Sequence, residues 1–143
     1  FRNLLIKTKG SIINISSVHA INTSENISLY AASKGCLSAL TRAMALEYGK
    51  LGIRVNSILP GAINTEMLRR GLERTNFDKS DINKLSLDEK IEILGKKHCI
   101  GHIGDPNDIS ELVLFLSDNN KSSYIVGQSI IIDGGATIKL STE

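Results

Sequence analysis

The segment Ile53-Arg54-Val55-Asn56-Ser57-Ile58-Leu59, followed by Pro60-Gly61, decides the fold. It is rich in β-branched and apolar residues with little alternation, a pattern typical of a strand in a parallel sheet that is covered on both faces. Segments 11–15 and 129–132 have the same character. We therefore expect three fully buried, parallel strands.

Helical patterns lie between these strands. Apolar spacing predicts helices over residues 28–48 and 108–118, the second with Asn107 or Asp108 as its N-cap, and a weaker helix over residues 87–94. Alternation of strands and helices favours right-handed βαβ units and an open parallel sheet. Because open sheets of this type usually have about six strands, we expect this chain to form only part of a domain.

The composition excludes several classes of protein. The 143 residues fit one domain, and 41% hydrophobic with 22% charged residues is an ordinary globular balance. A net charge of +2 is too small to indicate nucleic acid or an anionic membrane as the partner. Two cysteines argue against a disulfide scaffold. With no apolar run of membrane-spanning length and no signal-peptide pattern, we expect a cytoplasmic protein.

Three polar residues form the candidate catalytic group. Tyr30 and Lys34 are four residues apart on the first predicted helix, so their side chains lie on one face, one turn apart. Ser17 lies thirteen residues before Tyr30, just after the first predicted strand. Ligands bind at the carboxyl ends of strands in open α/β sheets, so the three side chains are expected to meet in one cleft.

Four motifs together resemble the short-chain dehydrogenase/reductase family, and in particular its 3-oxoacyl reductases. They are Gly10-Ser-Ile-Ile-Asn-Ile-Ser-Ser17, Tyr30-Ala-Ala-Ser-Lys34, Ile53 to Gly61, and Val126 to Gly135. The resemblance extends from residue 10 to residue 135 and corresponds to the C-terminal half of the family's domain. It implies a Rossmann-like, doubly wound parallel sheet, in which residues 1–143 are the C-terminal part of a single domain.

The resemblance also implies an activity, the NAD(P)-dependent interconversion of a ketone and a secondary alcohol. Tyr30 would be the general acid/base, Lys34 would acidify the phenol and bind the nicotinamide ribose, and Ser17 would orient the carbonyl. An unperturbed phenol has a pKa of about 10, and three pKa units correspond to about 4 kcal/mol. One positive charge at about 4 Å in an effective dielectric near 20 supplies about 4 kcal/mol, so a lysine is sufficient in magnitude.

The same resemblance implies further contacts. The positions expected to bind the cofactor, which is NAD or NADP, are Tyr30, Lys34, Pro60, Gly61, Ile63 and Thr65. Residues 66–104 would form a substrate-lid segment over a small carbonyl or alcohol substrate. The chain would assemble as a homodimer or homotetramer, without nucleic acid or membrane as a partner.

Other interpretations of the same residues stay open. A truncated, catalytically incompetent fragment could act only as an oligomerisation or interaction module. A Ser–Lys hydrolase would use Ser17 with a neutral Lys34, but it would leave Tyr30 without a purpose. We expect no metal site at His98, Cys99 and His102, because no fourth ligand has suitable spacing. His19 follows Ser17 closely and could line the cleft, but it is interpreted as a loop residue.

Overall fold

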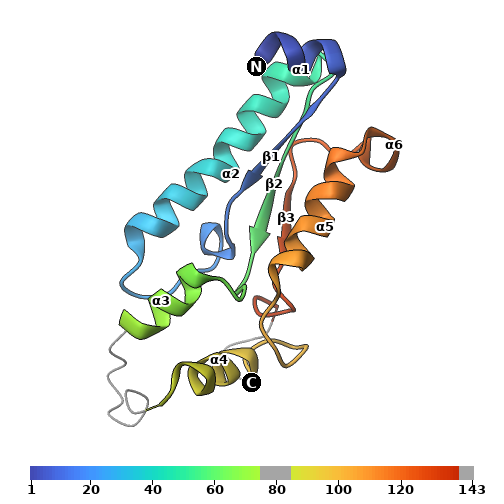
Figure 1. Cartoon of the computed structure of the whole chain (residues 1–143). Coiled ribbons are helices and arrows are strands. Elements are labelled where there is room, and N and C mark those ends of the chain that lie inside the picture. Colours follow the sequence, from blue (N-terminus) through green and yellow to red (C-terminus); the bar gives the residue numbers. More distant parts are fainter. Residues whose placement is uncertain (75–84, 139–143) are drawn as a thin grey trace. The chain divides into compact units, whose positions relative to one another are not determined.

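The computed structural model describes residues 1–74 and 85–138, which divide into two compact units (Figure 1). The first unit comprises Phe1–Pro60 and Ile109–Ile132, and the second comprises Gly61–Asp108 and Asp133–Glu143. Within the described residues, no helix combines the length and the apolar character that crossing a membrane requires.

The first unit is built on a parallel sheet with the strand order β1-β2-β3. Its elements are α1 (Arg2–Thr8), β1 (Ser11–Ile15), η1 (Val18–Ala20), α2 (Ser28–Gly49), β2 (Arg54–Pro60), most of α5 (Pro106–Ser117), α6 (Asn119–Ser122) and β3 (Ser129–Ile132). Ser11 lies opposite Arg54, and Ser57 lies opposite Ser129. Helix α2 packs along β1 and β2 (Figure 1). The predicted parallel α/β class is confirmed.

Strand β2 is the centre of this unit. Every residue from Arg54 to Leu59 is buried, and Val55 packs with Ile53 and Ala45 in the core. The buried Asn56 donates through Nδ2 to the Ile125 carbonyl at 2.8 Å and accepts from the Gln128 backbone N–H at 3.0 Å. Satisfied in this way, a polar side chain can occupy a central strand without a large penalty.

The expectation that all three strands are fully buried is wrong for two of them. The residues of β1 are partly buried except for the exposed Ile15, and β3 alternates between exposed and partly buried residues. The physical reason is their place in the sheet, since within the described residues each of them pairs with β2 alone. The runs of apolar residues correctly indicated strands, but they did not indicate how deeply each strand is buried.

Helix boundaries follow local signals, some of which the sequence interpretation missed. Helix α5 begins at Pro106, so Asp105 is its N-cap, and the predicted cap at Asn107 or Asp108 is wrong. The Asp105 carboxylate accepts from the Asn107 N–H at 2.9 Å, and the Asp108 carboxylate accepts from the Asp105 N–H at 2.8 Å. Proline at the first helical position loses no helical hydrogen bond. Helix α1 was not predicted; it ends at Thr8, and its C-cap Lys9 adopts a left-handed conformation with φ 50°.

The second unit contains α3 (Glu66–Arg74) and α4 (Leu87–Gly95), which contact each other. Helix α4 confirms the weak pattern over 87–94, and Ser86 and Glu89 form a capping box at its start. Helix α3 was not predicted. Both helices belong to the expected lid segment 66–104, of which residues 75–84 lie outside the described residues.

Candidate active site

Ser17 lies just past the carboxyl end of β1. It is 6% exposed and has an extended backbone, and it caps the short helix η1. Its Oγ accepts a hydrogen bond from the His19 backbone N–H at 3.2 Å. A hydroxyl that accepts one bond can still donate another, so Ser17 can present its proton to the oxygen of a ligand.

Lys34 links the first turns of α2 to the carboxyl end of β1, where Ser17 also lies. Its Nζ donates to the Ile15 carbonyl, the last of β1, at 3.0 Å. The same Nζ lies 5.6 Å from the centroid of the Tyr30 ring, which is within the range of cation–π attraction. Tyr30 is 36% exposed and can meet a ligand from solution. The predicted meeting of Tyr30 and Lys34 on one helix face agrees with this arrangement.

Ser16 joins β1 to α2 at this point, a contact that the sequence interpretation missed. Ser16 is 3% exposed, and its Oγ donates to the Lys34 carbonyl at 2.8 Å. About two turns of α2 further on, Asn14 of β1 donates through Nδ2 to Thr41 Oγ1 at 2.9 Å. The signal available in the sequence was the presence of polar residues inside an otherwise apolar strand, since buried polar groups need partners.

His19 contacts two of the candidate catalytic residues, through its backbone N–H to Ser17 and through its ring to Tyr30. Its ring meets the Tyr30 ring edge to face, with centroids 5.7 Å apart and an interplanar angle of 74°. Burial lowers the pKa of His19, so the neutral ring is favoured. Its Nδ1 is buried without a hydrogen-bond partner among the described residues. The interpretation of His19 as a loop residue is therefore incomplete, because its ring packs against the Tyr30 ring.

Because the pKa of His19 is lowered in the folded protein, the free energy of unfolding is expected to depend on pH. Below a pH of about 6.5 the unfolded chain takes up a proton on this histidine before the folded chain does. The free energy of unfolding should therefore fall as the pH decreases from 7.5 to 5.5. His19→Phe keeps the ring contact with Tyr30 but cannot titrate, and it should make this decline shallower.

Urea unfolding at both pH values checks this expectation. The control is His102→Phe, which changes an exposed histidine and should leave the decline as in the wild type. An identical pH dependence in the wild type and in His19→Phe would contradict the assignment.

The expected cofactor loop follows β2. Pro60 is the last residue of that strand in the first unit, whereas Gly61, Ile63 and Thr65 belong to the second unit. A Cβ on Gly61 would lie 2.7 Å from the Asp133 Cβ, so the backbone can pass there only as glycine.

Ile63 and Thr65 have structural partners of their own. Ile63 forms a parallel bridge with Gly104. The Oγ1 of Thr65 accepts from the Leu68 N–H at 3.3 Å, in the first turn of α3. Contact of these residues with a cofactor stays a prediction.

The three residues examined as metal ligands have other partners in the second unit. His98 is 4% exposed, and its Nδ1 is 3.0 Å from the Leu94 carbonyl. The Cys99 thiol donates to the Gly135 carbonyl at 3.2 Å, and His102 Nδ1 is 2.8 Å from the Ile103 carbonyl. In residues 1–74 and 85–138, no group of three or more His, Cys, Asp or Glu side chains is placed to hold a metal ion.

With this geometry in view, comparisons with known proteins identify the family. Residues 1–137 match the family model described as "Enoyl-(Acyl carrier protein) reductase". The parallel sheet with its helices is a Rossmann-like α/β fold. The motifs that contain Ser17, Tyr30 and Lys34 are the ones by which the sequence resembles the short-chain dehydrogenase/reductase family. The chain belongs to the short-chain dehydrogenase/reductase family.

Individual relatives agree with this assignment. An uncharacterized oxidoreductase of Thermotoga maritima is 37% identical over 134 residues, which are 94% of this chain and 48% of that protein. The meso-2,3-butanediol dehydrogenase of Serratia marcescens is 35% identical over 93% of this chain and 47% of its own length. The chain spans about half the length of the curated relatives it matches.

A solved structure shows the same fold. Ligand-free aldohexose dehydrogenase of Thermoplasma acidophilum superposes with a TM-score of 0.81 at 33% identity, covering 92% of this chain and 49% of that one. Acetoin dehydrogenase of Salmonella typhimurium gives a TM-score of 0.75 at 31% identity, covering 99% and 49%.

Proposed function

We propose that Ser17, Tyr30 and Lys34 are the catalytic residues of an NAD(P)-dependent oxidoreductase that interconverts a ketone and a secondary alcohol. The observation that carries the proposal is the position of the Lys34 ammonium. It lies 5.6 Å from the Tyr30 ring while it is bonded to the last carbonyl of β1, two residues before Ser17. The names of relatives such as cyclohexanol dehydrogenase and meso-2,3-butanediol dehydrogenase support this class of substrate.

Each residue has a distinct task in this proposal. Ser17 donates its hydroxyl proton to the carbonyl oxygen and holds the substrate against Tyr30, an oxyanion-type role. Tyr30 gives its phenolic proton to the oxygen as the alcohol forms, and it takes that proton back in the reverse direction. The positive charge of Lys34 stabilises the phenolate that remains.

The residues present fit a nicotinamide cofactor, which when bound supplies or accepts the hydride. A lysine ammonium has three N–H donors, and Lys34 uses one of them on Ile15. The others can donate to the two hydroxyls of a ribose, with the exposed Tyr30 beside them. Pro60, Gly61, Ile63 and Thr65 are proposed as further cofactor contacts. The proposal applies to NAD and NADP alike.

The remaining expectations complete the proposal. Residues 1–143 are proposed to be the C-terminal part of a single dehydrogenase domain, with 66–104 as its substrate-lid segment. A homodimer or homotetramer is supported by exposed apolar side chains in the first unit, with Leu29 87%, Leu46 82% and Leu114 62% exposed. A cytoplasmic location stays a prediction.

Titration with nicotinamide cofactors tests the proposed function. The full product of the gene that encodes this chain is titrated with NADH and with NADPH while nicotinamide fluorescence is followed. We expect saturable binding of at least one of them, and oxidation of that cofactor when small ketones are added. Tyr124→Phe, which changes a fully exposed tyrosine, serves as a control that should behave like the wild type.

The competing function is an oligomerisation or interaction module without catalysis. The same exposed leucines favour it, so assembly alone does not separate the two. Absence of binding for both cofactors, together with a stable assembly in sedimentation, would replace the oxidoreductase by the module. Covalent labelling of Ser17 by a fluorophosphonate would instead favour the hydrolase.

A further inference from the structure

A hollow of about 330 Å³ lies in the first unit, at the end of the sheet remote from Ser17. Among the residues that line it are Lys9, Gly52, Ile53, Arg54, Asn119 and Val126. Arg54 is the first residue of β2 and lies opposite Ser11, the first residue of β1. Ser17 follows six residues after Ser11, which is roughly 20 Å along an extended chain. The hollow is therefore separate from the proposed catalytic residues.

The guanidinium of Arg54 is buried beside this hollow. The residue is only 6% exposed. Its Nε donates to Asn119 Oδ1 at 2.9 Å, and its Nη2 donates to the Leu116 carbonyl at 2.8 Å. Its Nη1 is buried and has no hydrogen-bond partner among the described residues. Both acceptors are neutral, and one of the three guanidinium nitrogens is left without a hydrogen-bond partner there.

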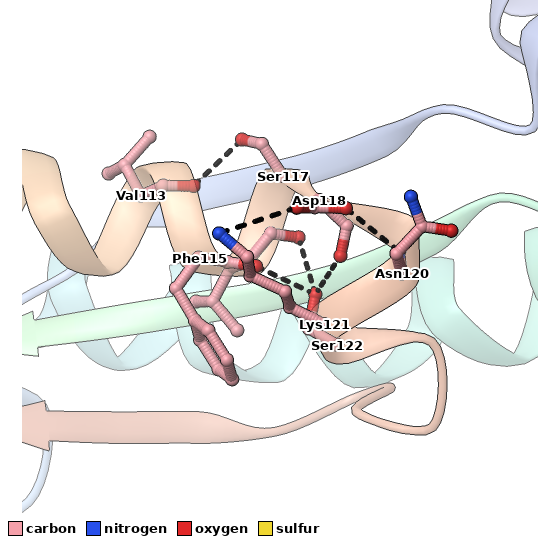
Figure 2. A network of polar contacts seen from close by, with 8 residues as sticks. Val113, Phe115, Ser117, Asp118, Asn120, Lys121 and Ser122 are labelled. Atoms are coloured by element: carbon pink, nitrogen blue, oxygen red, sulfur yellow. Dashed lines mark hydrogen bonds and ion pairs between the residues drawn. The ribbon is translucent and has the colours of Figure 1, made fainter.

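Asp118 does not supply the missing hydrogen bond. Its charge attracts the Arg54 guanidinium and opposes the lowering of the Arg54 pKa by burial, but no hydrogen bond or ion pair joins the two side chains among the described residues. Its carboxylate accepts from the Asn120 N–H at 2.8 Å and pairs with Lys121 at 3.6 Å (Figure 2). It is thus engaged at the start of α6. A buried donor without an acceptor is unfavourable, so Arg54 Nη1 favours an acceptor from solution, and a charged acceptor makes the stronger hydrogen bond.

Lys9 adds a second positive charge beside the hollow. The Asn119 amide donates to the Lys9 carbonyl at 2.8 Å, which holds this residue in place. The Lys9 side chain lies against Gly52. A Cβ placed on that glycine would be 3.3 Å from the Lys9 Cγ. Between the two cationic side chains, Ile53 and Val126 contribute apolar surface.

We propose that this hollow binds a small organic monocarboxylate. One carboxylate oxygen accepts from Arg54 Nη1, and the Lys9 ammonium balances the charge. The short alkyl chain of the ligand packs against Ile53 and Val126. A phosphate ion fits less well, because it has no apolar part to pack against Ile53 and Val126. The ligand would be neither the ketone nor the nicotinamide of the proposed reaction, given the distance from Ser17.

Titration of the intact protein with butyrate, followed through the ¹⁵N and ¹H signals of the arginine side chains, tests the proposal. We expect saturable shifts of the Arg54 Nη1 signals and weaker binding of inorganic phosphate and chloride. Arg54→Met should weaken butyrate binding at least tenfold, and Lys9→Met should weaken it severalfold. Arg42→Met, which removes an exposed guanidinium bonded to the Ser38 carbonyl, should bind butyrate like the wild type.

Three results would overturn the proposal. The first is that butyrate leaves the Arg54 signals of the wild type unmoved, a measurement that does not depend on any variant folding. The second is equal butyrate affinity in Arg54→Met and the wild type. The third is tighter binding of phosphate or chloride than of butyrate, which would make this a site for inorganic anions only.

Discussion

Tyr30→Phe is expected to lower kcat by about 10²–10⁴-fold, the usual contribution of a positioned proton donor. The change removes only the hydroxyl. The ring that meets His19 edge to face and lies under the Lys34 ammonium is kept. The variant should therefore fold, and it should bind NAD(P)H with an affinity close to that of the wild type.

Steady-state kinetics and cofactor fluorescence on the full gene product check this result together. Tyr124→Phe removes a hydroxyl from a tyrosine that is 100% exposed and should leave kcat unchanged. Near-normal turnover in Tyr30→Phe would refute the assignment of Tyr30 as the acid/base. Equal loss of turnover and of cofactor affinity would instead indicate a role in binding.

Lys34→Met is the second substitution with a large expected effect. It keeps the length of the side chain but removes the charge near Tyr30 and the bond to the Ile15 carbonyl. Loss of one group that stabilises developing charge typically costs about 10²–10³-fold in rate.

Single-turnover kinetics at saturating cofactor and a cofactor titration separate the two tasks of Lys34. We expect a slower single turnover even at saturating cofactor, and at least tenfold weaker NAD(P)H binding. Lys50→Met, an exposed lysine just after α2, should change neither. A single-turnover rate like that of the wild type, together with weakened cofactor binding, would leave Lys34 as a ribose ligand only and remove its role towards Tyr30.

The central features of the fold could be predicted because they depend on local patterns. Apolar segments located the strands, with the middle one observed over Arg54–Pro60. The spacing of Tyr30 and Lys34 placed them on one helix face, and their contact follows from helical geometry alone. The position of Ser17 just after a strand is also a local property, and the structure places it there.

What could not be predicted depends on contacts between distant segments. The edge-to-face contact of His19 with Tyr30 arises from the path of the chain after β1, which no short-range pattern encodes. Helix α3 is short and mostly charged, so its amphipathic character, which is strong, was not recognised among the polar residues around it. The unpaired nitrogen of Arg54 is visible only once α5 and α6 are packed beside β2.

The two bonds between the end of β1 and Lys34 have a mechanical consequence. The Ile15 carbonyl holds the ammonium, and the Ser16 hydroxyl holds the main chain of the same lysine. Ser17 is the next residue along. If β1 slides along its axis, Ser17 and the Lys34 ammonium should therefore move together. The distance between them should then stay the same when the edge of the sheet moves. Ser16→Ala would release one of these two attachments and allow the strand and the helix to drift apart.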